Sequence, residues 1–264
     1  MTIALDTKLD APPTLPPFTE EAVFIKRALL HSLRNTESLV MGIMLPVMLM
    51  LLFTFVFGGA LDESGDYVNY VVPGIILLCA GFGASATAVS VNQDMTSGII
   101  DRFRTMPIRG WAVLTGHIVA SLARNLVATG VVIGVALLVG FRPSGGPLEW
   151  LAAIAFVALY ILAITSLYAA IGLAAATPDA ASGYGFILLF LPYLSSAFVP
   201  VETMPSWLQW FSANQPITPL IETIRGLLMG GDTGSWPVAL VWSVGIIAVA
   251  TAWGAWLFRA RSAR

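Results

Sequence analysis

The chain has 264 residues, of which 57% are hydrophobic and 11% are charged, and its mean hydropathy is +0.84. This composition excludes the one or two soluble domains that the length alone would allow. The formal net charge of -2 says little by itself, because the positions of the charges along the chain matter more than their sum.

The N-terminal part is expected to lie outside the membrane. Residues 1–18 contain four prolines and predict a mobile cytosolic tail. Residues 19–36 predict an amphipathic interfacial helix, with Thr19 as N-cap, Glu20 and Glu21 in the first turn, and basic side chains between apolar ones. A simple basic flank to the first membrane helix explains the same residues.

Residues 37–264 predict a membrane domain of six helices, so the fold class is all-α and integral to the membrane. Five runs of at least 22 residues carry no charge, and a helix of about 20 apolar residues crosses a bilayer. A shorter sixth run, 125–141, lengthens if residues from Trp111 join it. The predicted helices cover about 38–58, 68–91, 112–140, 148–176, 181–200 and 236–257.

The basic residues predict that both termini are cytosolic. With that orientation the inner segments hold ten Lys and Arg residues and the outer segments hold two, Arg142 and Arg225, leaving Arg124 aside. The inner ones are Lys8, Lys26, Arg27, Arg34, Arg102, Arg104, Arg109, Arg259, Arg261 and Arg264.

A short charged segment separates the second and third predicted helices. As a helix, Ile99, Phe103 and Met106 share one face, and Asp101 and Arg104 lie on the other. Burying these charges in lipid would cost about 3 kcal/mol each, so the segment is expected at the cytosolic surface. A basic loop without a partner fits the same pattern.

The stretch Ser97 to Pro107 resembles the signature of ABC-2 transporter permeases, and more narrowly of the daunorubicin-resistance type, with Ser-Gly-x-x-Asp-Arg-Phe-Arg-x-x-Pro after the second helix. The resemblance implies a coupling helix that docks on an ATPase subunit, with two copies of that subunit contacting loop 94–110. The residues it assigns to this contact are Ser97, Gly98, Ile99, Asp101, Arg102, Phe103, Arg104 and Pro107.

A second resemblance lies between the fifth and sixth helices, where the family's Phe-x-Pro, Pro-x-Trp, Gln-Pro and Arg-Gly elements occur over residues 198–226. It implies re-entrant outer helices that form a gate, and a surface anchor rich in aromatic residues is the alternative. Glu222 and Arg225 are spaced to pair on a helix. The gate candidates are Pro205, Trp207, Trp210, Gln215, Pro216, Glu222 and Arg225.

The translocation pathway is expected among residues of helices 2, 3 and 5. Aromatic walls suit large amphipathic compounds, although lipid-facing packing explains the same rings. Arg124 either lines the inner mouth with His117 or extends to the headgroups. The candidates are Phe82, Ser85, His117, Arg124, Phe186, Phe190, Tyr193 and Phe198.

The chain is not expected to be an enzyme or to hold a cofactor. Its two lysines, Lys8 and Lys26, follow no Gly-rich phosphate loop, so ATP and Mg²⁺ would bind to the partner. Its two histidines, His31 and His117, are too few for a His-rich metal site. A serine protease with Ser85 and His117 is disfavoured, because small residues in membrane helices usually serve packing.

The expected function is that of a permease subunit of a drug, antibiotic or lipid-like compound exporter in a bacterial cell membrane. A second permease copy is the other expected partner, within the bilayer and without nucleic acid. Polysaccharide or glycolipid export is the alternative within the class. An ion-coupled secondary carrier is the alternative of another class, disfavoured because no Asp or Glu falls near the middle of a predicted helix.

Overall fold

The computed structural model describes residues 36–62, 65–97 and 110–262, and every regular element in them is helical. The all-α prediction is therefore confirmed for this part of the chain. The predicted tail and nearly all of the interfacial helix lie outside it. The elements are α2 (Thr36–Leu51), η1 (Leu52–Phe57), α3 (Gly58–Leu61), α4 (Tyr67–Thr96), α6 (Gly110–Val139), α7 (Pro147–Ala174), α8 (Pro178–Leu188), η2 (Leu191–Leu194), η3 (Val201–Thr203), α9 (Ser206–Asn214), α10 (Ile217–Met229) and α11 (Trp236–Ser262).

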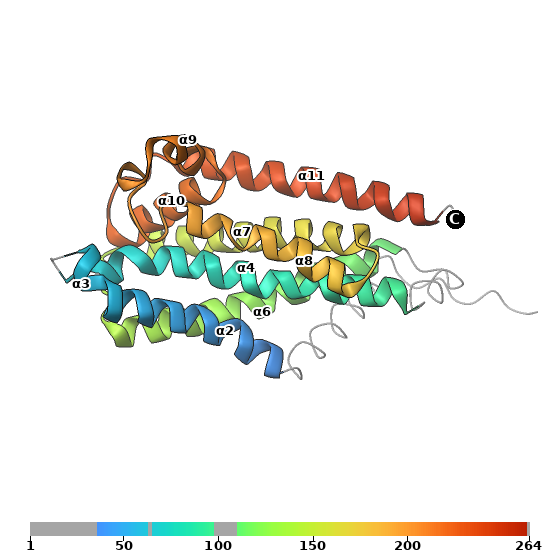
Figure 1. Ribbon diagram of the computed structural model, residues 1–264, viewed down its shortest axis with the longest axis horizontal. Coiled ribbons are helices and arrows are strands. Elements are labelled where there is room, and N and C mark those ends of the chain that lie inside the picture. The colour runs from blue at the N-terminus through green and yellow to red at the C-terminus, as the bar shows by residue number, and fades with distance from the viewer. Residues whose placement is uncertain (1–35, 63–64, 98–109, 263–264) are drawn as a thin grey trace, which may run out of the picture.

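Within the described ranges, five helices are long and apolar enough to cross a membrane, with window hydropathies between 1.9 and 2.3. They are Gly42–Leu61, which runs through α2, η1 and α3, and then α4, Leu114–Val139 of α6, α7, and Trp236–Leu257 of α11. They lie side by side along the long axis of the molecule (Figure 1). α4 is the central helix, since 67% of its window is buried, against 17% for the first helix.

The connections fall at two opposite ends of this bundle (Figure 1). One end, called here the α10 end, carries α3, the turn after α6, α9 and α10. The Arg142 N–H donates to Asn69 Oδ1 at 2.9 Å, and the Ser144 N–H to the Leu228 carbonyl at 3.0 Å, which ties three connections together. The other end, the Ser97 end, carries the end of α4, the start of α6 and the C-terminal end of α11.

The single helix predicted over 181–200 is wrong. α8 ends at Leu188, a 3₁₀ turn follows at Leu191–Leu194, and residues 195–199 form turns and a bend. Pro192 explains the break, because proline has no N–H to donate and disfavours helix at the residue before it. The fifth apolar segment is therefore a short helix followed by irregular backbone.

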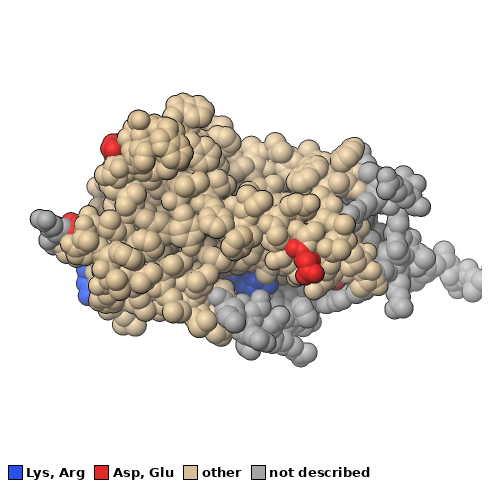
Figure 2. Space-filling model, viewed as in Figure 1, with Lys and Arg blue, Asp and Glu red and all other residues tan. Residues whose placement is uncertain are grey.

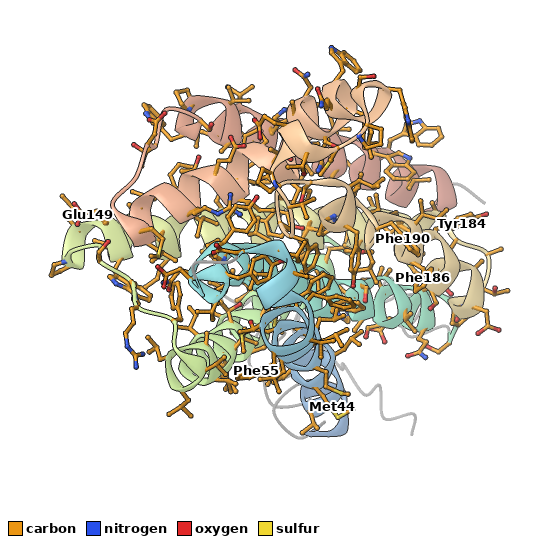
Figure 3. The ribbon with its side chains drawn as sticks, turned by 60° about the vertical axis from the view of Figure 1, so that its left-hand side comes forward. Met44, Phe55, Glu149, Tyr184, Phe186 and Phe190 are labelled. Atoms are coloured by element: carbon orange, nitrogen blue, oxygen red, sulfur yellow. The ribbon has the colours of Figure 1, made fainter. Side chains whose placement is uncertain are left out.

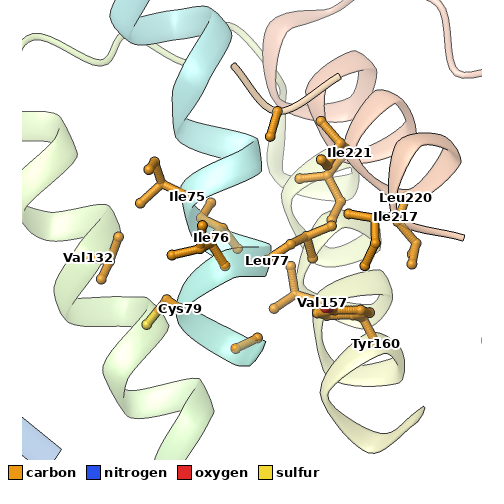
Figure 4. Close-up of a cluster of buried hydrophobic side chains, with 14 of the residues drawn as sticks. Ile75, Ile76, Leu77, Cys79, Val132, Val157, Tyr160, Ile217, Leu220 and Ile221 are labelled. Carbon is orange, nitrogen blue, oxygen red and sulfur yellow. The ribbon is translucent and has the colours of Figure 1, made fainter. Parts of the chain in front are cut away.

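The core is built around the middle of α4. Ile75, Ile76 and Leu77 are almost fully buried there. Figure 4 shows their neighbours, which come from three other helices: Val132 of α6, Val157 and Tyr160 of α7, and Ile217, Leu220 and Ile221 of α10. Dense interlocking of this kind holds helices together in lipid, where the hydrophobic effect between helices is weak.

α4 and α7 approach closely at the Ser97 end. A Cβ atom at Gly172 would lie 2.4 Å from the Ala88 carbonyl oxygen, so only glycine fits. The Asn92 amide donates to the carbonyls of Gly172 and Ala175, at 3.0 and 2.8 Å, and caps the end of α7. A small residue and a buried amide therefore fix this crossing together.

We predict that Gly172→Ala destabilises the protein, because its methyl group meets backbone that cannot rotate away. Overpacking typically costs about 1–3 kcal/mol. The measurement is thermal unfolding of the detergent-purified chain by fluorescence-detected size exclusion. Gly134→Ala is the control, since nothing lies within 4 Å of its added Cβ. Equal melting temperatures for the two variants would contradict the prediction.

Candidate functional site

The segment predicted to contact a partner is bounded by α4 and α6. Ser97 caps α4, is exposed, and donates its N–H to the Gln93 carbonyl at 2.9 Å. α6 begins at Gly110. The other predicted contact residues, Gly98, Ile99, Asp101, Arg102, Phe103, Arg104 and Pro107, lie outside the described residues.

The two helices that bracket this segment are joined by a hydrogen bond. Asp94 Oδ2 of α4 lies 2.8 Å from His117 Nε2 of α6, and the side chains are 21% exposed for His117 and 26% exposed for Asp94. This contact links the end of α4 to the first turns of α6. The predicted place of His117 beside a pathway is not tested by this contact.

Arg124 also contacts α4, as its predicted sharing of a face with His117 requires. One of its Nη atoms donates to the Gly83 carbonyl at 3.1 Å. Next to it lies a buried polar layer that the sequence analysis missed. The Thr87 hydroxyl donates to Ser121 Oγ at 3.0 Å, and the Asn125 amide donates to the Ser121 carbonyl at 2.9 Å. The sequence signal was faint, since single Ser, Thr and Asn residues in apolar helices serve helix association in general.

Four of the pathway candidates form a row of rings. Phe186 lies 5.2 Å from Phe190, Phe190 lies 6.3 Å from Tyr193, and Tyr193 stacks on Phe198 at 5.3 Å, centroid to centroid. Phe53 of η1, which the sequence analysis did not select, continues this aromatic row at 4.3 Å from Phe198. The row thus connects α8 to the first membrane helix.

The row changes from exposed to buried along its length. Phe186 and Phe190 are 58% and 52% exposed, whereas Phe198 is 6% exposed. Figure 3 shows Phe186 of α8 close to Phe190, which follows that helix, and both apart from Met44 and Phe55 of the first helix. The face seen in Figure 2 carries few charged side chains. By the exposure of its rings, the row runs from the surface into the bundle.

The remaining two pathway candidates lie on α4 and do not join the row. The Ser85 hydroxyl donates to the Phe82 carbonyl at 2.8 Å within the helix, which satisfies it without a partner from another element. Phe82 packs against the core cluster. Among the described residues it makes no ring contact with the aromatic row.

The gate candidates lie on and between α9 and α10. Pro205 precedes α9 and Pro216 precedes α10, where proline suits a helix start. Trp207 and Trp210 are 78% and 75% exposed, as an interfacial aromatic pair would be. Gln215 is 5% exposed between the two helices.

Gln215 and Arg225 bind the irregular backbone that follows α8. The Gln215 amide lies within donating distance of the Leu191 and Leu194 carbonyls, at 3.3 and 3.4 Å. Arg225 donates to the Ser196 carbonyl at 2.7 Å and to the Tyr70 carbonyl from two nitrogens at 3.2 and 3.1 Å. Its guanidinium also lies 3.8 Å from the centroid of the Tyr70 ring.

Two tyrosines of α4 that the sequence analysis missed complete this network. The Tyr67 hydroxyl donates to the Phe198 carbonyl at 2.7 Å, and the Tyr70 hydroxyl donates to the Ser196 carbonyl at 3.0 Å. Their phenols lie 131 and 126 residues from these carbonyls in sequence, a separation that no local pattern reveals.

The expected ion pair between Glu222 and Arg225 is not formed. Glu222 accepts a hydrogen bond from the Ser235 hydroxyl at 3.0 Å, and Arg225 turns to the carbonyls instead. The Ser196 carbonyl lies in the irregular backbone after α8 and has no helical donor, whereas the Tyr70 carbonyl belongs to α4, so the guanidinium joins these two elements. Burial lowers the pKa of Arg225, and the charges of Tyr70 and Glu222 oppose that shift.

A protein-family model and individual known proteins both match this chain. The family model described as ABC-2 type transporter matches residues 20–229. The chain is 34% identical over 211 residues to "Daunorubicin resistance ABC transporter permease protein DrrB1" of Streptomyces coeruleorubidus, covering 78% of this chain and 74% of that protein. It is 27% identical over 256 residues, or 92% of each chain, to "Probable doxorubicin resistance ABC transporter permease protein DrrC" of Mycobacterium tuberculosis.

A further relative is "Probable multidrug ABC transporter permease YbhR" of Escherichia coli, 26% identical over 165 residues, or 60% of this chain and 44% of the relative. The matched region 20–229 includes four of the five long helices. The resemblance carried by Ser97 to Pro107 is confirmed, and the chain belongs to the ABC-2 type transporter family of multi-pass membrane permeases.

Proposed function

We propose that this chain is the permease subunit of an ATP-driven exporter of hydrophobic or amphipathic drug-like compounds. The observation that carries the proposal is the similarity to permeases named for daunorubicin and doxorubicin resistance, over 78% and 92% of the chain. ATP and Mg²⁺ would bind to a separate ATPase, since the two lysines follow no phosphate loop.

The orientation places the Ser97 end of the bundle in the cytosol of a bacterial cell. The basic residues support it, because Arg259 and Arg261 belong to the C-terminal end of α11 at that end, and Arg102, Arg104 and Arg109 fall in the sequence between Ser97 and Gly110, where α4 ends and α6 begins. The α10 end then faces outside. α8 and the segment up to residue 200 form the sixth crossing in this proposal, and α9 and α10 re-enter from outside.

The ATPase would act on segment 97–107, and the Asp94–His117 pair would carry its displacement to the bundle. Asp94 and His117 lie 2.8 Å apart, on the two helices that precede and follow the segment in the chain. Displacing one helix end therefore shifts the other. Two ATPase copies and two permease copies would form the complete exporter, with the second permease either identical or related.

The aromatic row would be one wall of the pathway. Its rings change from more than half exposed at Phe186 to buried at Phe198, so a planar compound could exchange one ring contact for the next. Gln215 and Arg225 would belong to the outer gate, since they bind the backbone of residues 191–196 within this row, and Trp207 and Trp210 would belong to it as exposed residues of the neighbouring α9.

Cells that express the chain with its ATPase partner should extrude daunorubicin, and an inactive ATPase should stop this extrusion. In vesicles supplied with ATP, drug transport should continue when a proton uncoupler is added. The fluorescence of the accumulated drug measures transport in both experiments. Transport abolished by the uncoupler and indifferent to the ATPase would support an ion-coupled carrier instead. Export of a lipid-linked sugar without drug export would support a polysaccharide or glycolipid permease.

The coupling segment is tested by the combined variant Arg102→Glu, Arg104→Glu and Phe103→Ala. It removes the two cations and the apolar ring of the proposed contact, so co-purification of the ATPase should fall at least about tenfold, since anchors at interfaces are worth 2 kcal/mol or more. Arg259→Glu with Arg261→Glu is the matched control at the same end of the bundle. Full retention of both the complex and export in the triple variant would disprove the assignment.

The role of the aromatic row as a wall of the pathway is tested by Phe186→Ala and Phe190→Ala. Each removes a ring contact worth about 0.5–1.5 kcal/mol, so the drug concentration for half-maximal stimulation of ATP hydrolysis should rise roughly two- to tenfold. Phe55→Ala is the control, because Phe55 is 68% exposed and makes none of the ring contacts of the row. If Phe55→Ala changes this drug concentration as much as Phe186→Ala and Phe190→Ala do, the rings of Phe186 and Phe190 face lipid and not substrate.

A further inference from the structure

Residues 195–198 are buried although their backbone is neither helix nor strand. Ser195, Ser196, Ala197 and Phe198 are at most 6% exposed. Peptide groups in such a position lose water without gaining the bonds of a helix, and each costs several kcal/mol if it stays unbonded. The segment therefore depends on donors from elsewhere in the chain.

Arg225 of α10 is the donor that links this segment to two other elements at once. Its Nη2 donates to the Ser196 carbonyl at 2.7 Å and to the Tyr70 carbonyl of α4 at 3.1 Å, and its Nε donates again to Tyr70 at 3.2 Å. The Ser196 carbonyl also accepts from the Tyr70 hydroxyl at 3.0 Å. A guanidinium suits this place, because its planar fork reaches two acceptors in fixed directions.

The segment is seated against α4 with no space between them. A Cβ atom at Gly74 would lie 2.6 Å from the Ala197 Cβ, so the two backbones touch. Dispersion contacts of this kind fall off steeply with distance. The close fit adds to the hydrogen bonds that hold the segment against α4.

We infer that Arg225 is a positioning residue that latches segment 195–198 closed against α4 at the α10 end. This rests on the proposed function in one respect, that the α10 end faces outside. Bonds from a charged donor are roughly twice as strong as neutral ones, so Arg225 contributes more than the hydroxyls of Tyr67 and Tyr70. Without it, the segment separates from α4 and admits water and solutes from outside.

The test measures how fast a cysteine at position 196 reacts with a charged, membrane-impermeant methanethiosulfonate added to intact cells. Ser196→Cys keeps the carbonyl that Arg225 binds, and its Oγ has no hydrogen bond to lose. Cys79, the sole cysteine of the sequence, is buried and is replaced by alanine in every variant. Arg225 is then compared with Arg225→Lys and Arg225→Met.

Arg225→Met should raise the reaction rate at position 196 at least about tenfold, which corresponds to about 1.4 kcal/mol. The rate in Arg225→Lys should lie between the rates in the wild type and in Arg225→Met, since an ammonium group lacks the planar set of donors that a guanidinium has. Arg142→Met is the matched control: Arg142 also donates to backbone carbonyls at the α10 end, but to those of Leu137 and Phe141 beside it in sequence. It should leave the rate unchanged.

A second probe separates local opening from general loosening. Ser212→Cys on α9 is also buried with an unbonded Oγ, and its reactivity should change less than twofold in Arg225→Met. An unchanged rate at position 196, or an equal rise at 212, overturns the inference. Ser206→Cys, on the exposed start of α9, reports reagent access.

The outcome is independent of drug transport, because labelling requires neither the ATPase nor a substrate. If the cysteine at position 206 stays unlabelled, the orientation in the proposed function is wrong. The labelling rates at positions 196 and 212 are then measured in inside-out vesicles, where the other face of the membrane is accessible to the reagent. If the wild-type complex exports no drug, the proposed function fails while the labelling still decides the latch.

Discussion

The structure depends on one constraint, that backbone polar groups shielded from water must be bonded within the protein. The five long helices of the described residues meet it internally, through N–H bonds to carbonyls four residues back and, in the π-helical turn η1, five residues back. The segment after Leu188 does not, because the helix breaks there. Side chains of α4 and α10 supply the missing donors, and this need explains why α10 is inserted against α4 and α7 with its Ile217, Leu220 and Ile221 buried.

α4 connects the hydrogen-bond network around Arg225 at the α10 end with the Asp94–His117 contact at the Ser97 end. It is one helix of 30 residues, with Tyr67 and Tyr70 at the α10 end and Asp94 at the Ser97 end. Small residues allow its neighbours to come close, at Gly74 against Ala197 and at Gly172 against Ala88. A displacement beside Ser97 and a rearrangement around Arg225 would therefore share one structural element, which is the simplest physical basis for coupling two ends of a bundle.

The membrane helices were predictable within a few residues at most ends, because long uncharged runs admit little else in a bilayer. The fifth was predicted as one helix, although Pro192 was visible in it, since membrane helices often tolerate proline and Pro46 of α2 is an example. The four ring candidates of the aromatic row were selected on the fifth predicted helix, and they contact one another although that helix is interrupted. Phe53 was not, because it comes from a distant part of the chain.

The sequence by itself determined the membrane environment and the family, since these follow from composition, local order and short motifs. Only the tertiary structure decided the partners of the polar residues. Glu222 and Arg225 have ideal spacing for a pair, yet Arg225 bonds to carbonyls 155 and 29 residues away and Glu222 bonds to Ser235. A charge in an apolar fold goes to the nearest unbonded acceptor, and which acceptors remain unbonded depends on where a helix breaks and what packs against the break.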